Sequence, residues 1–199
     1  MGLREFKKQR RRHEIADKGT ALFAARGFDH VTVAEVAEAA GVSEKTVFNY
    51  FPTKEDIFFD EIPEKEAALV ETIRGREPGE SVLSALRRRQ LADCGRFSSP
   101  GFAEWARIME DSPALRAKEL EVMAHFAEVL AEALEQELDV DELDARVAAS
   151  LLIGIHWQFF LRARKRALAG KHGPAAARRL RADLERAYEL LEHGLGSLA

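Results

Sequence analysis

The apolar residues of this chain recur mostly three and four positions apart, which is the period of an α-helix. No stretch shows the alternation of β-branched apolar and polar residues that predicts a strand. Prolines are few, whereas alanine, leucine, glutamate and arginine, which lose little side-chain freedom in a helix, are abundant. The pattern therefore predicts an all-α protein of about nine helices.

The amino-terminal part contains four predicted helices, three of which have clear signals at their first residues. Thr32 and Glu35 have the spacing of a capping box, in which each side chain accepts from the other's backbone amide. Ser43 and Thr53 are N-cap residues before the third and fourth helices. Pro52 ends the third helix, because proline disfavours helical geometry in the residue before it. The four expected spans are about 8–26, 32–40, 43–51 and 54–73.

Five further helices are predicted in the rest of the chain. Clusters of glycine, proline, serine and aspartate mark the turns between them. Their expected spans are about 80–95, 101–111, 113–137, 141–169 and 174–197. The fourth helix is expected to connect two domains, residues 1–56 and residues 57–199.

Residues 32–51 have the pattern of a helix-turn-helix, two short helices joined by a turn that contains Gly41. Glycine permits a sharp reversal that residues with a Cβ atom resist. The apolar residues expected to lock the two helices together are Val36, Ala37, Ala40, Val42, Val47 and Phe51. The outer face of the second helix is then able to enter a DNA major groove, which is wide enough for an α-helix.

The outer face of that second helix differs from an ordinary solvated surface. It combines hydroxyl, amide, ammonium and aromatic groups, which can meet phosphates and base edges: Glu44, Lys45, Thr46, Phe48, Asn49 and Tyr50. The alternative is a three-helix core that never touches DNA, since this geometry alone does not fix a function. An exposed Phe48 and Tyr50 favour DNA binding.

Four segments resemble the amino-terminal domain of the TetR family of bacterial regulators: Ala21–Phe28, Thr32–Ala37, Ala40–Ser43 and Thr46–Asp56. The resemblance covers about the first third of the chain. It implies a homodimer, each subunit having a helix-turn-helix DNA-binding domain and a larger helical domain for ligand binding and dimerisation. These two roles would belong to residues 1–56 and 57–199.

The same resemblance assigns expected roles to individual residues. Four side chains would contact phosphates: Thr32, Thr46, Tyr50 and Lys54. Four others would lie nearest the bases: Glu44, Lys45, Phe48 and Asn49. Ser43 completes the expected DNA-binding set. The chain departs from the family where it has Phe48 in place of a common tyrosine, and Gly19 where alanine is usual.

Residues 3–10 and 48–51 also resemble an actinobacterial branch of the family that includes mycofactocin-type regulators. That branch suggests ligands similar to acyl-CoA. The sequence of the carboxy-terminal domain does not itself indicate this ligand class.

The charge distribution agrees with DNA binding although the net charge is −4. Residues 4–12 carry six basic residues and one acidic residue, and would contact phosphates unless they form only a solvated terminus. Cys94 is the only cysteine, which excludes an intramolecular disulfide. No apolar run is long enough for a signal peptide or a membrane span, so we expect a cytoplasmic protein with no membrane partner.

The last two helices are expected to form a homodimer, which favours a near-palindromic operator. The final helix carries an apolar stripe suited to packing against another helix: Ala177, Leu180, Leu184, Ala187, Leu191, Leu195 and Leu198. The helix over 141–169 is apolar all round at its centre. One of its faces could therefore meet the subunit core while another meets a partner.

The central helices are expected to enclose an apolar cavity for a small effector. Its candidate lining residues are Phe102, Trp105, Met109, Met123, Phe126, Leu130, Leu152, His156, Trp157 and Phe160. These residue types serve a packed core equally well. His156 is expected either to orient a polar ligand group or to be a hydrogen-bonded core residue, and Cys94 to be an inert thiol.

The sequence thus predicts a repressor that an apolar or amphipathic small molecule releases from its operator. A regulator without a small-molecule ligand is the alternative within the same class. An enzyme is the alternative from another class. The sequence has no nucleophile–base constellation, phosphate loop or metal-ligand cluster, so we expect no enzyme activity, cofactor or metal.

Overall fold

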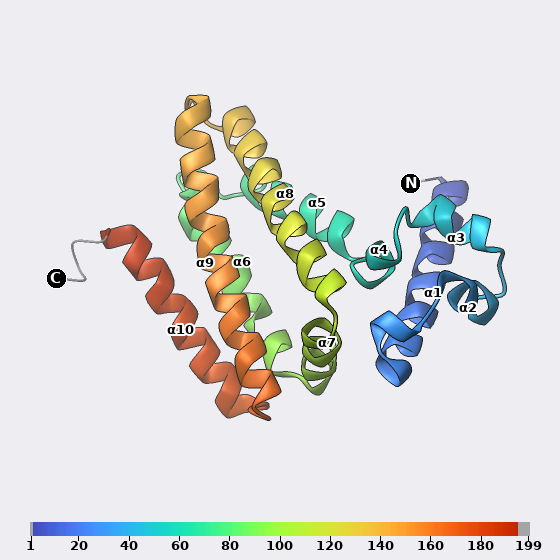
Figure 1. Cartoon of the computed structure of the whole chain (residues 1–199). Helices are drawn as coiled ribbons and strands as arrows, with labels where there is room; N and C mark the ends of the chain where they lie inside the picture. The colour runs from blue at the N-terminus through green and yellow to red at the C-terminus, as the bar shows by residue number, and fades with distance from the viewer. Residues whose placement is uncertain (1, 195–199) are drawn as a thin grey trace. The chain divides into compact units, whose positions relative to one another are not determined.

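The computed structural model describes residues 2–194, and these form a chain of α-helices (Figure 1). The first five helices are α1 (Leu3–Arg26), α2 (Val33–Ala39), α3 (Glu44–Tyr50), α4 (Lys54–Phe58) and α5 (Ile62–Arg74). The others are α6 (Val82–Asp93), α7 (Pro100–Asp111), α8 (Pro113–Glu137), α9 (Glu142–Leu168) and α10 (Pro174–His193). Two 3-10 segments are η1 (Phe28–His30) and η2 (Cys94–Ser98). Since the described residues contain no strand, the predicted all-α class is confirmed.

The chain divides into two compact units. Met1–Pro63 and Arg107–Glu119 make up the first unit, and Glu64–Ala106 and Leu120–Ala199 the second. Within the first unit, Ser112 Oγ donates to the Asp29 carboxylate at 2.7 Å. This bond ties the segment that starts α8 to η1, a long-range contact that the sequence pattern does not indicate.

The helix predicted over residues 54–73 is wrong, because the structure divides it into α4 and α5. Pro63 is the second residue of α5. Proline has no amide hydrogen and clashes with the preceding turn, so it is tolerated in the first turn of a helix but interrupts a longer one. The Asp60 carbonyl at the break accepts a 2.6 Å hydrogen bond from the Arg12 guanidinium, so α1 holds the interruption in place.

The other boundaries differ from prediction by a few residues. α1 begins at Leu3 and not near residue 8, so the basic segment is helical. The helix expected over 80–95 ends at Asp93 and continues as η2. α10 ends at His193, and the remainder of its predicted span lies outside the described residues.

The second unit is built around the packing of α9 against α10, with α6 alongside them (Figure 1). Leu180, Leu184 and Tyr188 of α10 are buried against Ala149 and Phe159 of α9. Burial raises the pKa of the Tyr188 phenol. Two of the apolar residues that defined the predicted dimer stripe, Leu180 and Leu184, therefore belong to the core of their own subunit.

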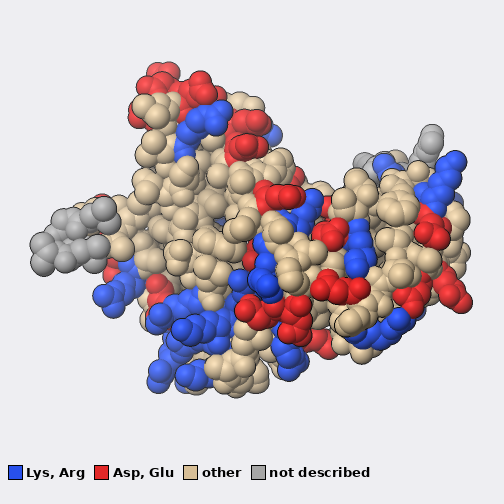
Figure 2. Space-filling model, in the orientation of Figure 1, with Lys and Arg blue, Asp and Glu red and all other residues tan. Residues whose placement is uncertain are grey.

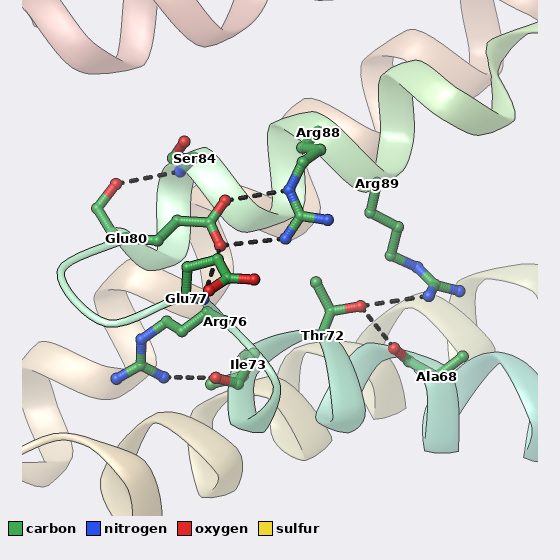
Figure 3. A network of polar contacts seen from close by, with 10 residues as sticks. Ala68, Thr72, Ile73, Arg76, Glu77, Glu80, Ser84, Arg88 and Arg89 are labelled. Carbon is green, nitrogen blue, oxygen red and sulfur yellow. Dashed lines mark hydrogen bonds and ion pairs between the residues drawn. The ribbon is translucent and has the colours of Figure 1, made fainter.

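A polar network fixes the turn between α5 and α6 (Figure 3). Arg88 donates two hydrogen bonds of 3.1 Å to the Glu80 carboxylate, which also accepts from the Glu77 amide. On α5, Thr72 Oγ1 donates to the Ala68 carbonyl and accepts from Arg89. These bonds hold the first turns of α6 against the last turns of α5. No helix within residues 2–194 is long and apolar enough to cross a membrane.

Gly19 lies where α1 crosses α4 in the first unit, and this contact explains its identity. A Cβ atom there would lie 2.6 Å from Ile57 Cγ2, which is too close for van der Waals contact. Gly19→Ala should gain about 1 kcal/mol of helix propensity but lose about 1–3 kcal/mol to overpacking. We expect a lower melting temperature by calorimetry. Ile57→Leu removes the Cγ2 branch and should rescue the alanine variant. A more stable single variant would contradict this explanation.

Candidate functional site

The helix-turn-helix is set by capping interactions at the start of each helix. The Thr32 amide donates to the Glu35 carboxylate at 2.8 Å, and the Glu35 amide donates to Thr32 Oγ1 at 3.3 Å. The hydrogen bond from the Thr32 amide, with others from Arg26 and the Thr32 hydroxyl, lowers the pKa of Glu35 to about 2. The carboxylate is therefore charged at neutral pH, and the predicted capping box is confirmed.

The turn and the start of α3 also follow the prediction. Gly41 has a φ of 64°, in the left-handed region that favours glycine. Ser43 Oγ accepts from the Thr46 amide at 3.1 Å and lies 2.8 Å from Thr46 Oγ1. Both hydroxyls are therefore occupied in capping α3. Thr53 caps α4 in the same way, by a reciprocal pair with Asp56.

α3 buries one face and exposes the other. Val47 and Phe51 are fully buried in the first unit, whereas Phe48 is 49% exposed. Glu44, Lys45 and Asn49 are exposed, and Thr46 and Tyr50 are half-buried. The side chains of Glu44, Lys45 and Asn49 have no hydrogen-bond or ion-pair partner among the described residues. This face offers a carboxylate, an ammonium group and an amide to a ligand at the helix surface.

Two basic side chains lock this motif from within. The Arg12 guanidinium lies over the Phe51 ring, 4.6 Å from its centroid, and Lys54 Nζ lies 4.1 Å from the Phe28 centroid. Lys54 Nζ also donates to the Phe28 and Val31 carbonyls at 3.0 and 3.1 Å. Lys54 therefore ties the start of α4 to the segment before α2. Two of its three ammonium hydrogens are used inside the protein, which leaves one for a phosphate.

The predicted DNA-contacting set thus separates into two groups. Glu44, Lys45, Phe48 and Asn49, expected nearest the bases, all lie exposed on one helix. Among the residues expected at phosphates, Thr32 and Lys54 are engaged in internal hydrogen bonds. Arg12 was not predicted to have a site role, and the sequence gave no signal of its stacking on Phe51 beyond its place in a basic run. The individual DNA-contact roles stay predictions.

An all-α chain with a helix-turn-helix of this exposure defines the class of helix-turn-helix transcriptional regulators. The family model for bacterial regulatory proteins of the tetR family matches residues 15–60. The HTH-type transcriptional regulator TcmR of Streptomyces glaucescens is 30% identical over 152 residues, which cover 70% of this chain and 67% of TcmR. This chain belongs to the TetR family of DNA-binding transcriptional regulators.

Two further comparisons extend the similarity. The putative mycofactocin biosynthesis transcriptional regulator MftR of Mycobacterium tuberculosis is 30% identical over 125 residues, covering 60% of this chain and 61% of MftR. The solved structure of Thermus thermophilus FadR, a TetR-family repressor in complex with lauroyl-CoA, has a TM-score of 0.54 and 25% identity. That likeness covers 92% of this chain and 94% of FadR. The match to FadR therefore includes the second unit as well as the first.

The candidate effector residues fall into several environments. Four of them form an aromatic cluster in the second unit: Phe102, Trp105, His156 and Phe160, with ring centroids 5.3–6.2 Å apart for the contacting pairs. Phe126, Leu130 and Leu152 are buried, and Met123 and Trp157 are half-buried. Met109 is fully buried and belongs to the segment grouped with the first unit.

A cavity of about 360 Å³ lies elsewhere in the second unit, between the ends of α6, α8, α9 and α10. Its walls include Leu83, Leu134, Leu138 and Leu152, and Asp144 is its charged lining residue. Leu152 is the predicted effector residue that lines it. The remaining nine candidates stay a prediction without a described cavity around them.

His156 and Cys94 have environments that suit packing. Burial, reinforced by the charge of Lys65, lowers the pKa of His156 to about 4, so its imidazole is neutral at pH 7. Burial raises the pKa of the Cys94 thiol to about 11, so the reactive thiolate is scarce at neutral pH. The described residues contain no cluster of three metal-ligating side chains.

The sequence reasoning overlooked two charged segments of the second unit. Residues 135–144 contain six acidic residues and no basic one, and residues 162–181 contain eight lysines and arginines and no acidic one. Counting charge in short windows would have found both. In Figure 2, acidic atoms gather at one end of this unit and basic atoms at the other.

Base reading and phosphate contact can be separated by two substitutions in α3. Lys45→Ala should relax the preference for a particular base by about 1–3 kcal/mol if its ammonium meets a guanine edge. Tyr50→Ala should weaken binding about equally for all sequences, because phosphate contacts carry no sequence information. Operator selection followed by titration measures both effects. An unchanged consensus for Lys45→Ala would contradict base reading by Lys45.

The internal hydrogen bonds of Lys54 make a separate prediction. Lys54→Met would leave the Phe28 and Val31 carbonyls without their donor, and should lower the free energy of unfolding by about 1–3 kcal/mol. Operator affinity should fall with it. Lys18→Met, at an exposed position of α1, is the matched control and should change neither. Reduced affinity with an unchanged melting temperature would mean that the Lys54 ammonium serves only DNA.

Proposed function

We propose that this protein is a repressor that binds a near-palindromic operator as a homodimer and leaves it when a small amphipathic molecule binds the second unit. The observation that carries DNA reading is the outward face of α3. Lys45 and Asn49 are exposed there without internal partners, beside an exposed Phe48. Ammonium and amide groups donate to base edges, and an aromatic ring can pack on a thymine methyl group.

The proposed homodimer is supported by apolar surface on α9. Leu143, Val147 and Leu151 are large apolar side chains left exposed on this helix. Surface of this kind on a folded subunit is typical of an interface. On α10, Leu191 is half-buried, while Leu195 and Leu198 of the predicted stripe lie outside the described residues. α9 therefore contributes more to the proposed interface than the stripe of α10 does.

The proposed effector is an apolar or amphipathic small molecule. The cavity beside Leu134 and Leu152 is almost wholly apolar and is about 360 Å³, within the usual size range for small-ligand sites. The resemblance to FadR in complex with lauroyl-CoA favours an effector with an acyl chain. Release from DNA requires that this molecule bind the non-DNA state more tightly, since equal affinity for both states shifts nothing.

A regulator without a small-molecule effector is the second candidate function. The close packing of Phe102, Trp105 and Phe160 favours it, because these rings fill the space that the sequence reserved for a ligand. The two candidates differ only in the second unit. DNA binding by α3 is common to both.

Operator binding and release test the proposal directly. A band shift with promoter DNA should show an affinity that falls steeply with salt concentration, because lysine and arginine displace counterions from phosphates. Lauroyl-CoA should lower operator affinity tenfold or more, which needs about 1.4 kcal/mol of coupling. Leu138→Trp should fill the cavity and abolish release while preserving operator binding.

The outcomes distinguish the two candidate functions. Salt-dependent binding without release by lauroyl-CoA, lauric acid or other screened amphiphiles would favour the effector-free regulator. Phe126→Ala tests the alternative ligand position among the ten predicted residues. If Phe126→Ala abolished release and Leu138→Trp did not, the effector would bind away from the described cavity.

A further inference from the structure

The exposed apolar side chains of α9 lie in one row along the helix. Leu143, Val147 and Leu151 are 69%, 50% and 51% exposed, and each follows the previous one by four residues. Residues at this spacing share one face of an α-helix. The row continues to Gly154 and the exposed Gln158 near the middle of the helix. A second protein surface is the expected cover for such a row.

Gly154 is unusual because it lies in the interior of a 27-residue helix. Glycine there costs about 1 kcal/mol relative to alanine. A Cβ atom built at Gly154 would meet nothing within 4 Å, so no contact inside the subunit requires glycine. At an exposed position, the missing side chain instead permits close approach by another backbone.

The two ends of α9 carry opposite charge. Asp139, Asp141 and Glu142 lie at its amino-terminal end, and Arg162, Lys165 and Lys171 lie at or just beyond its carboxy-terminal end. Figure 2 shows the acidic and basic groups at opposite ends of the second unit, with uncharged surface between them. The face of α9 is thus apolar at its acidic end, open at Gly154 and basic at its other end.

Several of these charges are not satisfied within the subunit. Asp139, Lys165 and Lys171 have no side-chain partner among the described residues. Arg162 and Arg166 both pair with one carboxylate, that of Asp183, at 2.6 and 3.6 Å. Each end therefore keeps a surplus of one sign that a complementary surface could neutralise.

We propose that two copies pair through this face of α9 with the helices antiparallel and crossing at Gly154. The acidic end of each copy then meets the basic end of the other. The proposal deepens the homodimer of the proposed function and depends on it. An antiparallel crossing at Gly154 pairs positions eleven residues to either side, which places Leu143 opposite Lys165, roughly 16 Å from the crossing point.

The charges select this direction over a parallel one. A parallel pair would bring acidic end to acidic end and basic end to basic end. Opposed like charges are destabilising, whereas complementary charges at the rim of an interface fix its register more than its affinity. The apolar row supplies contact area, Gly154 permits close approach, and the charges determine orientation.

Charge reversal at the two ends tests the pairing. Asp139→Lys with Glu142→Lys reverses the acidic end, and Lys165→Glu with Lys171→Glu reverses the basic end. Each double variant should raise the dimer dissociation constant at least tenfold in sedimentation equilibrium, and the fourfold variant should return it to within about threefold of wild type. Glu64→Lys, an exposed position on α5, is the control and should change nothing. Circular dichroism shows whether each variant remains folded.

Mixing distinguishes the two directions even if a double variant is unstable. Wild type and the fourfold variant, carrying different tags, should form only homodimers if the helices are antiparallel, because mixed pairs would oppose like charges. A parallel arrangement would instead favour mixed dimers, and their recovery would overturn the proposal. A monomeric wild type would refute the homodimer itself, so the two failures are distinguishable.

Cross-linking tests the register in a Cys94→Ala background. Gly154→Cys should give a covalent dimer with a short thiol cross-linker, because the crossing brings the two copies of residue 154 together. Leu143→Cys alone should not, since its two copies would be roughly 33 Å apart. A mixture of Leu143→Cys and Lys165→Cys should cross-link. Efficient cross-linking of Leu143→Cys to itself would contradict the crossing at Gly154.

Discussion

The shortness of α3 is the constraint on which the DNA-reading surface depends. Helices below about 12–15 residues are marginal in water, and α3 has seven. Its structure therefore comes from tertiary contacts: Val47 and Phe51 are fully buried, and the Arg12 guanidinium covers the Phe51 ring. The Ser43 cap satisfies an amide that would otherwise be unpaired. Because one face is held so completely, Lys45 and Asn49 on the other are free to meet DNA.

Local rules account for what the sequence predicted well. The caps at Thr32, Ser43 and Thr53 depend on residues three positions apart, so spacing alone identifies them. The division of residues 54–73 was missed although Pro63 signals it, since the apolar periodicity was given more weight than a proline inside the span. Lys54 was beyond such rules, because its carbonyl partners lie 23 and 26 residues earlier in the chain.

The second unit was harder to predict for a physical reason. Ligand cavities and packed cores use the same apolar and aromatic residues, so periodicity cannot separate them. Phe102, Trp105 and Phe160 pack against one another, while the described cavity is lined mainly by leucines and alanines that no motif distinguishes. A cavity is the difference between the volume that helices enclose and the volume that side chains fill. That difference is fixed only when the helices are placed.

Net charge concealed the feature that gives the second unit its direction. A total of −4 is compatible with an even mixture, yet acidic and basic residues are separated along α9. In an isologous dimer the same patch occurs on both subunits, so any surface used must be complementary to itself after a twofold rotation. A helix face that is acidic at one end and basic at the other meets this condition only in the antiparallel sense. A twofold pair of reading heads in turn requires an operator with matching half-sites, and the charges on α9 thereby act on DNA recognition through the symmetry of the dimer.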